Sequence, residues 1–398
     1  MRSAEYSALP GEQRKPALDG LRGIAALSVA LGNCVLQVTG LALWGTSLRD
    51  FPSTPAADIL IRPASALFPS DAAVLVFFVL SGHVLWESFR RKQSRFVADL
   101  PDYVCARAYR LFPLTIAAAI PLGCFVSAPA ADLVRNMLLL SRNLNGVLWS
   151  LQVEVVASLA LFAVWGLTRG MGWKLAAALL LSLGLRRVFQ GNMYAAFFPA
   201  FIMGAAISSI PAAWLRNRWV IAAGPALLVL SNIVFGHNGA RVYGMVGAVA
   251  VVGAAGAGRF AFLRSRVVLF LGAISYPFYL THPIGLNGAA WVLAMLPLTS
   301  TWPNIAARAV ISIGLTIPLA WALHVLVEVP VLRDRPRLRW PFRWEAGGGV
   351  LRLVGGIRPA VRWLAPRAGY PRRLAAVSDP SARQPVITPR HYTNRLNP

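Results

Sequence analysis

Long apolar stretches recur along most of this chain, and they constrain its fold more than any other feature. The first runs from Leu21 to Leu43 and carries one charged residue, Arg22, near its start. A helix of about 20 apolar residues is long enough to cross the hydrocarbon core of a membrane. Hydrophobic residues make up 57% of the chain and charged residues 14%, whereas soluble domains carry about a quarter charged residues. We therefore predict a polytopic membrane protein.

Hydropathy windows of about 19 residues predict about ten membrane-spanning helices. They fall near residues 21–43, 71–89, 103–126, 148–167, 174–188, 195–210, 219–235, 242–257, 267–296 and 305–327. The expected fold class is all-α, a bundle of transmembrane helices. The segments 174–188 and 195–210 are short, so a re-entrant pair is an alternative at that place.

The distribution of positive charge predicts the orientation of the bundle. The net charge is +24, and the Lys and Arg residues gather in alternate loops and in the tail. Basic loops stay on the cytoplasmic side, so both termini are expected in the cytoplasm and the protein in the inner membrane, in contact with anionic lipids. Nucleic acid is not expected as a partner, because no basic stripe is interleaved with exposed aromatic residues.

Composition divides the chain into three parts. We predict a cytoplasmic segment at 1–16, a transmembrane domain at 17–333 and a cytoplasmic Arg/Pro-rich tail at 334–398. Apolar residues from Val350 to Leu364 recur at helical spacing with arginines between them, which allows an amphipathic helix on the membrane surface. The alternative for this stretch is a disordered extension, and disorder is expected beyond Tyr370.

Polar side chains inside the apolar stretches are candidates for function, because an ionisable group in a membrane is costly unless it is paired or hydrated. Glu154 shares a helix face with Ser150, and Trp149 lies beside that face. His324 and Glu328 are one helical turn apart. Each such residue alone could hold two helices together. Together they favour a buried polar site; the members in or next to the spans are Asn33, His83, Glu154, His282, His324 and Glu328.

Two arginines near the start of the third predicted span have the spacing of an anion-binding pair. Arg107 and Arg110 are separated by three positions, so their guanidinium groups share one side of a helix. Guanidinium groups bind phosphate through paired hydrogen bonds. The alternative is ordinary anchoring of the helix in the inner leaflet. The three cysteines lack the spacing of a metal site or of a disulfide framework, and no metal is expected.

Six short motifs, taken together and in order, resemble the acyltransferase 3 family of integral membrane acyltransferases. They are LDGLRGIAAL (18–27), FFVLSG (77–82), RAYRLFPL (107–114), LWSLQVE (148–154), ISYPFYLTHP (274–283) and VEVP (327–330). The resemblance implies a ten-helix domain that takes an acyl group, usually acetyl, from coenzyme A at the cytoplasmic face. It also implies transfer of that group to a hydroxyl of a cell-surface glycan or lipid-linked saccharide, with acyl-CoA as a donor substrate and no bound cofactor.

The resemblance also implies a set of site residues, with one departure. Arg22 matches a basic residue that the family carries in its first helix, but Asn33 stands where the family has a histidine held to be catalytic. An amide cannot take a proton from a hydroxyl near neutral pH. The expected catalytic group is Arg22, Asn33, His83, Glu154, His282 and Glu328, with His83 as a substitute base. The expected acyl-CoA contacts are Arg107, Arg110, Trp149, Ser150 and Tyr276.

Two other functions remain open at this point. A catalytically silent family member that translocates or scaffolds a lipid-linked glycan would need no base, which is consistent with Asn33. A secondary transporter of a small anion could use Arg22 and Glu154 as gating charges. The six motifs argue against the transporter, and replacement of Asn33 by histidine distinguishes a silenced enzyme from a translocator.

Overall fold

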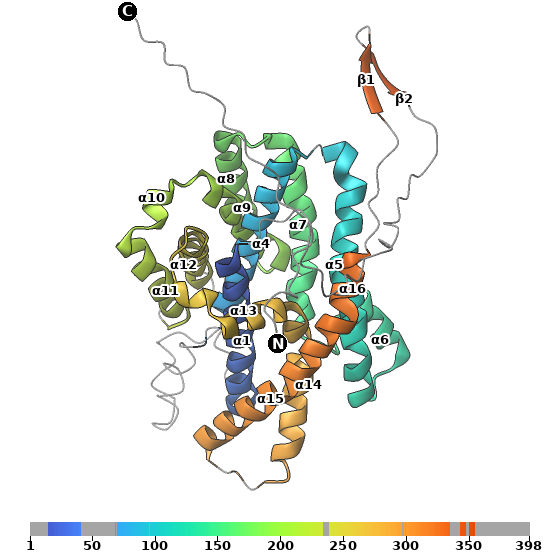
Figure 1. The fold of residues 1–398 in the computed structure, drawn as a ribbon, viewed down its shortest axis with the longest axis vertical. Helices are drawn as coiled ribbons and strands as arrows, with labels where there is room; N and C mark the ends of the chain where they lie inside the picture. The colour runs from blue at the N-terminus through green and yellow to red at the C-terminus, as the bar shows by residue number, and fades with distance from the viewer. Residues whose placement is uncertain are drawn as a thin grey trace, which may run out of the picture. The chain divides into compact units, whose positions relative to one another are not determined.

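A computed structural model describes residues 15–40, 68, 70–94, 96–233, 239–296, 298, 300–334, 343–347 and 350–354. In this part of the chain the helices are α1 (Pro16–Thr39), α4 (Ser70–Lys92), α5 (Phe96–Phe125), α6 (Ala130–Met137), α7 (Leu148–Thr168), α8 (Gly172–Val188), α9 (Met193–Ala206), α10 (Ala212–Leu215), α11 (Arg218–Ile233), α12 (Gly239–Gly256), α13 (Arg266–Ala273), α14 (Ser275–Leu293), α15 (Thr301–Leu323) and α16 (Val329–Arg333) (Figure 1). Short 3₁₀ turns lie at η2 (Ile207–Ser209) and η3 (Ala261–Arg264), and a π-helical turn, η4 (His324–Glu328), joins α15 to α16.

The predicted all-α membrane fold is confirmed. Among the described residues, five helices are long and apolar enough to cross a membrane: α1, α4, α5, α7 and the continuous stretch Thr301–Arg333. The described residues of each of the ten apolar segments are mainly helical, because lipid forces a chain to satisfy its backbone hydrogen bonds internally. The helices α9, α11 and α12 are apolar but shorter, so the count of ten crossings stays a prediction.

The ninth predicted segment differs from a single straight crossing. It consists of α13 and α14, which meet at a bend of 78° between Ala273 and Ser275. The hydroxyl of Ser275 donates to the carbonyl of Gly272 at 2.8 Å, so a side chain satisfies a backbone acceptor at the break. Pro277 follows in the first turn of α14, where its missing N–H is tolerated. Hydropathy does not detect this bend, because both helices are apolar.

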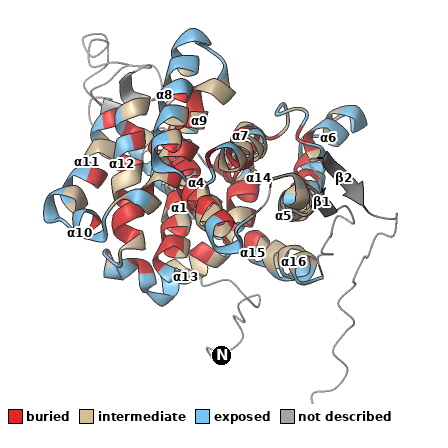
Figure 2. Ribbon diagram, turned by 90° about the horizontal axis from the view of Figure 1, so that it is seen from above, coloured by how far each residue is buried: buried red, intermediate tan, exposed pale blue. Residues whose placement is uncertain are grey.

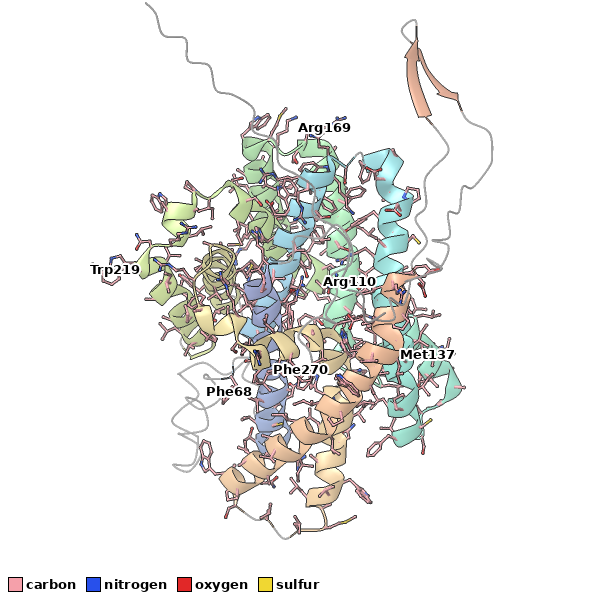
Figure 3. All side chains as sticks on the ribbon, viewed as in Figure 1. Phe68, Arg110, Met137, Arg169, Trp219 and Phe270 are labelled. Atoms are coloured by element: carbon pink, nitrogen blue, oxygen red, sulfur yellow. The ribbon has the colours of Figure 1, made fainter. Side chains whose placement is uncertain are left out.

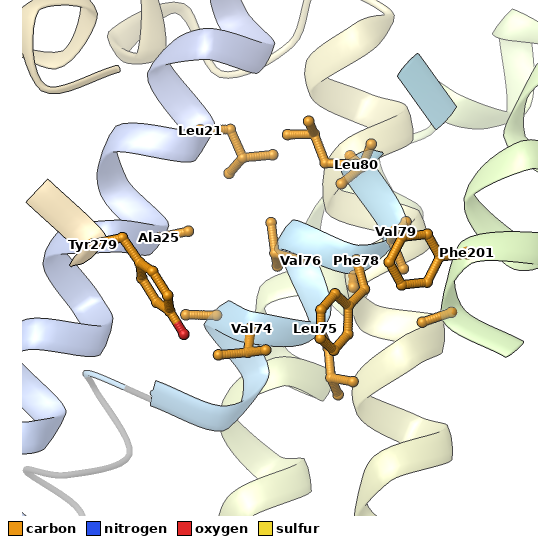
Figure 4. Packing of buried hydrophobic residues seen from close by; sticks show 14 of the residues in the cluster. Leu21, Ala25, Val74, Leu75, Val76, Phe78, Val79, Leu80, Phe201 and Tyr279 are labelled. Atoms are coloured by element: carbon orange, nitrogen blue, oxygen red, sulfur yellow. The ribbon is translucent and has the colours of Figure 1, made fainter. Parts of the chain in front are cut away.

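Helix α4 lies at the centre of the described bundle, packed against α1, α7, α9 and α12. Buried residues concentrate on these helices, whereas α8, α10 and α11 are largely exposed (Figure 2). Figure 4 shows the core around α4, with the ring of Phe78 stacked on that of Phe201 at a centroid distance of 5.1 Å. Tyr279 of α14 reaches this core beside Val74.

The two ends of the bundle differ in charge. We call the end at which α4 terminates, with Arg90, Arg91 and Lys92, the basic end, and the end at which α4 begins, at Ser70, the opposite end. The indole of Trp165 donates to the carbonyl of Ser94 at 2.8 Å, which places the end of α7 at the basic end. Arg169 follows α7 there (Figure 3).

Residues 350–354 adopt a structure different from the helix that the apolar spacing allowed. Strand β1 (Arg343–Gly347) pairs antiparallel with β2 (Val350–Val354). Three consecutive glycines, at 347–349, oppose a helix at this position because glycine loses the most backbone entropy when it is ordered. The rest of the predicted tail helix, residues 355–364, lies outside the described residues.

A close approach of α4 and α9 predicts an effect of mutation on stability. A Cβ atom on Gly82 would collide with the backbone carbonyl of Phe201, and one on Gly204 would collide with that of Val79. Gly82→Ala should therefore lower the free energy of unfolding by about 1–3 kcal/mol, because helix backbones must separate. Thermal unfolding in detergent measures the change. Gly184→Ala is the control, since a Cβ there meets no atom of the described residues within 4 Å. Equal stability of the two variants would contradict the packing described.

Candidate functional site

An ion pair between α5 and α7 forms the first part of the candidate site. An Arg107 Nη atom lies 3.2 Å from Glu154 Oε1, and the side chains are 11% and 24% exposed. Arg107 Nε donates to Ser158 Oγ at 3.2 Å, and Ser81 Oγ of α4 donates to Glu154 Oε1 at 3.4 Å. Ser158 lies one turn after Glu154 on the same face of α7, which is why Arg107 reaches both side chains. Three helices thus converge on one carboxylate.

Tyr276, in the first turn of α14, lies among the charges of this region. Its hydroxyl donates to the carbonyl of Leu111 at 3.0 Å, which ties α14 to α5. The phenol interacts electrostatically with Glu154, Glu328, Arg107 and Arg110. Arg110 is exposed on α5, close to α16 (Figure 3). The structure therefore brings four predicted charged residues around one predicted tyrosine, with Arg110 accessible from outside.

A chain of hydrogen bonds forms the second part of the site. Ser150 Oγ lies 2.7 Å from the hydroxyl of Tyr279, and the carbonyl of Tyr279 lies 2.7 Å from His282 Nδ1. On the other side of the imidazole, His282 Nε2 lies 2.9 Å from Asn33 Nδ2 of α1. His282 is completely buried. The chain connects α7, α14 and α1, and Ser150 joins it to the turn of α7 that carries Glu154.

The contacts of His282 define its tautomer. A carbonyl oxygen only accepts, so Nδ1 carries the proton and donates it to Tyr279. In the neutral ring Nε2 then has a lone pair, and it accepts a hydrogen bond from the Asn33 amide. Asn33, which stands where the resembled family has a histidine, thus donates a hydrogen bond to the basic nitrogen of His282. His282 and Asn33 together supply what a general base and its positioning group need.

His83 lies in a different environment from Asn33. It is 5% exposed, and its Nδ1 has no hydrogen-bond partner among the described residues. Its described electrostatic neighbours are Glu87, one turn further along α4, and Lys15, at the start of α1. These residues lie toward the basic end, so the described contacts do not bring His83 to the Asn33 and His282 pair.

The remaining predicted residues have local partners. Arg22 pairs with Asp19 at 3.3 Å within α1. His324 Nδ1 lies 2.6 Å from Glu328 Oε2 across the π-helical turn η4, a type of distortion that is frequent at functional sites. Trp149 packs against Phe197 and Phe78, with ring centroids 5.1 and 6.1 Å apart. The bonds described do not join Arg22 or Trp149 to the hydrogen-bonded network.

Several residues of the network were not predicted from the sequence. Ser81, Ser158 and Tyr279 complete the contacts of Glu154, Arg107 and Ser150. Spacing contained a signal for Ser158, which lies four positions after Glu154 on the same face. Asn145 donates to the carbonyl of Leu280 at 3.0 Å. It precedes α7, so no helical spacing in the sequence pointed to this contact. Within the described part of the chain, no three His, Cys, Asp or Glu side chains are placed to share a metal ion.

Comparison with known proteins identifies the family. The family model described as an acyltransferase domain, acyltransferase 3, matches residues 15–325, which include the Arg107–Glu154 pair and the chain of hydrogen bonds from Ser150 to Asn33 but not Glu328. No curated protein and no solved structure matches the chain. The matched region covers most of the sequence and all the helices from α1 to α15. The chain is therefore a multi-pass membrane protein that belongs to the acyltransferase 3 family.

Proposed function

We propose that this protein transfers an acyl group, most simply acetyl, from acyl-CoA to a hydroxyl of a cell-surface glycan or lipid-linked saccharide. The observation that carries the proposal is the hydrogen bond between Asn33 and His282, which sets an imidazole lone pair beside an amide donor. Family membership supports acyl transfer as the reaction class. The abundance of Arg and Lys at the basic end supports a cytoplasmic position for that end in the inner membrane, with both termini on the same side.

In the proposed reaction His282 is the general base. The acceptor hydroxyl takes the place of the Asn33 amide at His282 Nε2 and gives its proton to that nitrogen. The hydroxyl oxygen then attacks the thioester carbonyl, an ester bond forms, and the carbon–sulfur bond breaks. Coenzyme A leaves as the thiolate and takes up the proton from His282. The displaced amide of Asn33 is a hydrogen-bond donor for the oxyanion that develops in the tetrahedral intermediate.

The charged part of the site positions the donor. Arg110 is exposed on α5 and would bind coenzyme A phosphates, with Arg107 one turn before it on the same helix. Glu154 fixes Arg107 through their ion pair, and Ser158 holds its Nε. Tyr276 links these residues to α14, which carries His282. Bringing the thioester and the hydroxyl together in one orientation would supply much of the rate.

Purified protein in lipid nanodiscs, supplied with radiolabelled acetyl-CoA and a membrane glycan fraction, tests the proposal. We expect label to enter the glycan and free coenzyme A to appear in equal amount. Release of coenzyme A without labelled glycan would indicate hydrolysis instead. Absence of both products with every acyl-CoA and glycan fraction would contradict acyl transfer.

Asn33→Ala should lower kcat by about 10² relative to the wild type, because it removes an oxyanion donor and leaves the substrate-binding arginines in place. The initial rate of acetyl transfer at saturating acetyl-CoA is the measurement. The same rate in both proteins would contradict a role for the Asn33 amide.

Asn33 itself favours one alternative, a catalytically silent member that translocates or scaffolds a lipid-linked glycan. Asn33→His discriminates between the two. An inactive wild type that gains acyl transfer with Asn33→His would be a silenced enzyme. If neither protein transfers acyl groups while a labelled lipid-linked glycan crosses the bilayer of reconstituted vesicles, the protein is a translocator.

A further inference from the structure

A row of polar side chains runs along α15, which is largely apolar and packs against α1 and α14 (Figure 1). Asn304, Arg308 and Ser312 follow one another at intervals of four positions, so they share one side of the helix. We call these three residues the polar row. Five buried side-chain atoms in the described part of the chain lack a hydrogen-bond partner there, and three of them lie on this row: Asn304 Oδ1, Arg308 Nε and Ser312 Oγ.

Arg308 connects the polar row to α1. One of its Nη atoms donates to Gln37 Oε1 at 2.9 Å, although the two residues are 271 positions apart. Gln37 is exposed and lies one turn after Asn33, so the two amides share a face of α1. Gly32 packs against Ser70, the residue at which α4 begins, so this part of α1 lies at the opposite end of the bundle. The row therefore adjoins the face of α1 that carries Asn33.

Ser312 connects the polar row to α14. It is 1% exposed, and a Cβ atom on Gly285 would come within 3.2 Å of Ser312 Oγ. Gly285 follows His282 by three positions, about one turn of α14. The thiol of Cys34, next to Asn33, interacts with Ser312 but is a weak partner, and their contact does not reach hydrogen-bond geometry. The row thus extends to within one turn of the candidate base.

The three unpartnered atoms have different hydrogen-bonding capacities. Arg308 Nε only donates, Asn304 Oδ1 only accepts, and the hydroxyl of Ser312 does both. A saccharide hydroxyl also donates and accepts, so a set of such hydroxyls can satisfy all three atoms. A sulfate or carboxylate group only accepts and would leave the oxygen of Asn304 unpaired. Burial of unpaired polar atoms is costly, so their alignment on one face favours a ligand over a purely structural role.

We propose that the polar row binds hydroxyl groups of the acceptor saccharide and leads it from the opposite end of the bundle to His282. The identification of this saccharide as the acceptor rests on the proposed function, whereas the saccharide site itself does not. Eight residues of helix separate the ends of the row, a rise of about 12 Å, which is longer than one sugar ring. Arg107 and Arg110, assigned to acyl-CoA, lie on α5, so donor and acceptor would use different helices.

Binding of a saccharide in the absence of acyl-CoA tests the proposal. The probe is a set of oligosaccharides cut from the surface glycan of cells that make this protein, freed of O-acyl groups with mild alkali and labelled with tritium at the reducing end. Equilibrium dialysis against the full chain in phosphatidylcholine nanodiscs measures the affinity. We expect saturable binding by the wild type, about fivefold weaker binding by Ser312→Ala and Asn304→Leu, and about tenfold weaker binding by Arg308→Lys.

Thr316→Val is the matched control, one turn after Ser312 on α15. Thr316 is also completely buried, but its hydroxyl already donates to the carbonyl of Ser312 at 2.7 Å. We expect Thr316→Val to bind the oligosaccharides within about twofold of the wild type, because no spare hydrogen bond is removed. Ser312→Ala should keep the wild-type melting temperature, because the lost hydroxyl has no partner among the described residues. A lower melting temperature of Ser312→Ala with unchanged saccharide binding would show helix packing instead and overturn the proposal.

Two further outcomes would reject the saccharide site. One is absence of binding by the wild type, or equal binding by the wild type and all three row variants. The other is displacement of the oligosaccharides by excess sulfate, which would mean that Arg308 holds an anion rather than hydroxyl groups.

Kinetics separate this site from the proposed function. In an active protein the row variants should raise KM for the glycan and leave KM for acyl-CoA unchanged, whereas an unchanged KM for the glycan would contradict the acceptor assignment. Failure of acyl transfer with intact saccharide binding would reject the proposed function and leave the saccharide site in place.

Discussion

Replacing His282 by glutamine should lower the rate of acyl transfer by about 10²–10⁴, the range that general base catalysis contributes. In the structure His282 Nε2 faces the amide of Asn33, and Nδ1 is oriented by the carbonyl of Tyr279. Glutamine is close in size to histidine and makes hydrogen bonds but cannot accept the proton of the acceptor hydroxyl. The loss should appear in kcat, with KM for acyl-CoA changed little, because Arg107 and Arg110, the proposed phosphate-binding residues, lie on α5.

His83→Gln is the matched control, since His83 is also buried and on a packed helix. We expect it to change kcat by less than about threefold, because His83 faces Lys15 and Glu87 rather than Asn33. Melting temperatures of both variants check that loss of activity does not reflect unfolding. Abolished transfer in His83→Gln with full transfer in His282→Gln would reverse the roles and restore His83 as the base.

Breaking the Arg107 and Glu154 ion pair should give the largest change in stability. Arg107→Met leaves a carboxylate that is 24% exposed without its cation, and we expect the free energy of unfolding to fall by about 3 kcal/mol. Glu154→Gln should also destabilise, because Arg107 then loses its countercharge. The double variant should be more stable than the sum of the two effects predicts, with a coupling energy of about 1–3 kcal/mol. KM for acyl-CoA should rise in Arg107→Met.

The exposed pair Asp132 and Arg135 is the control for this double-mutant cycle. Its side chains are 31% and 62% exposed, so water screens the charges and the coupling energy should stay below about 0.5 kcal/mol. Denaturant unfolding in detergent provides the free energies. A coupling energy for Arg107 and Glu154 as small as that of the exposed pair would contradict the role of the ion pair in joining α5 to α7.

The sequence was sufficient to predict the long apolar helices, because the need to form backbone hydrogen bonds inside lipid is met within each segment, whereas the short helices α6, α10 and α16 were not predicted. Each apolar segment must form its own backbone hydrogen bonds, so length and hydropathy identify it without knowledge of its neighbours. The bend at Ala273 was missed for the same reason, since α13 and α14 are both apolar. The pairing of β1 with β2 was missed because the apolar residues from Val350 onward recur at helical spacing, and the glycines that precede them were not weighed.

Parts of the site that depend on helical spacing were also predictable. Glu154 and Ser150 share a face, and His324 reaches Glu328 one turn on, as the intervals of four residues indicate. The hydrogen bond between Asn33 and His282 was not predictable, because its partners are 249 positions apart and meet only through packing of α1 against α14. The contact of Arg308 with Gln37 depends in the same way on α15 and α1.

The most direct test of acyl transfer compares the surface glycans of cells that carry the wild-type protein with those of cells that carry His282→Gln. Mass spectrometry of the isolated glycans, with both proteins present at equal levels in the membrane, provides the readout. The proposed function predicts a glycan heavier by one acyl group in wild-type cells and its absence in the variant. Identical glycan masses in the two strains and in cells without either protein would contradict it.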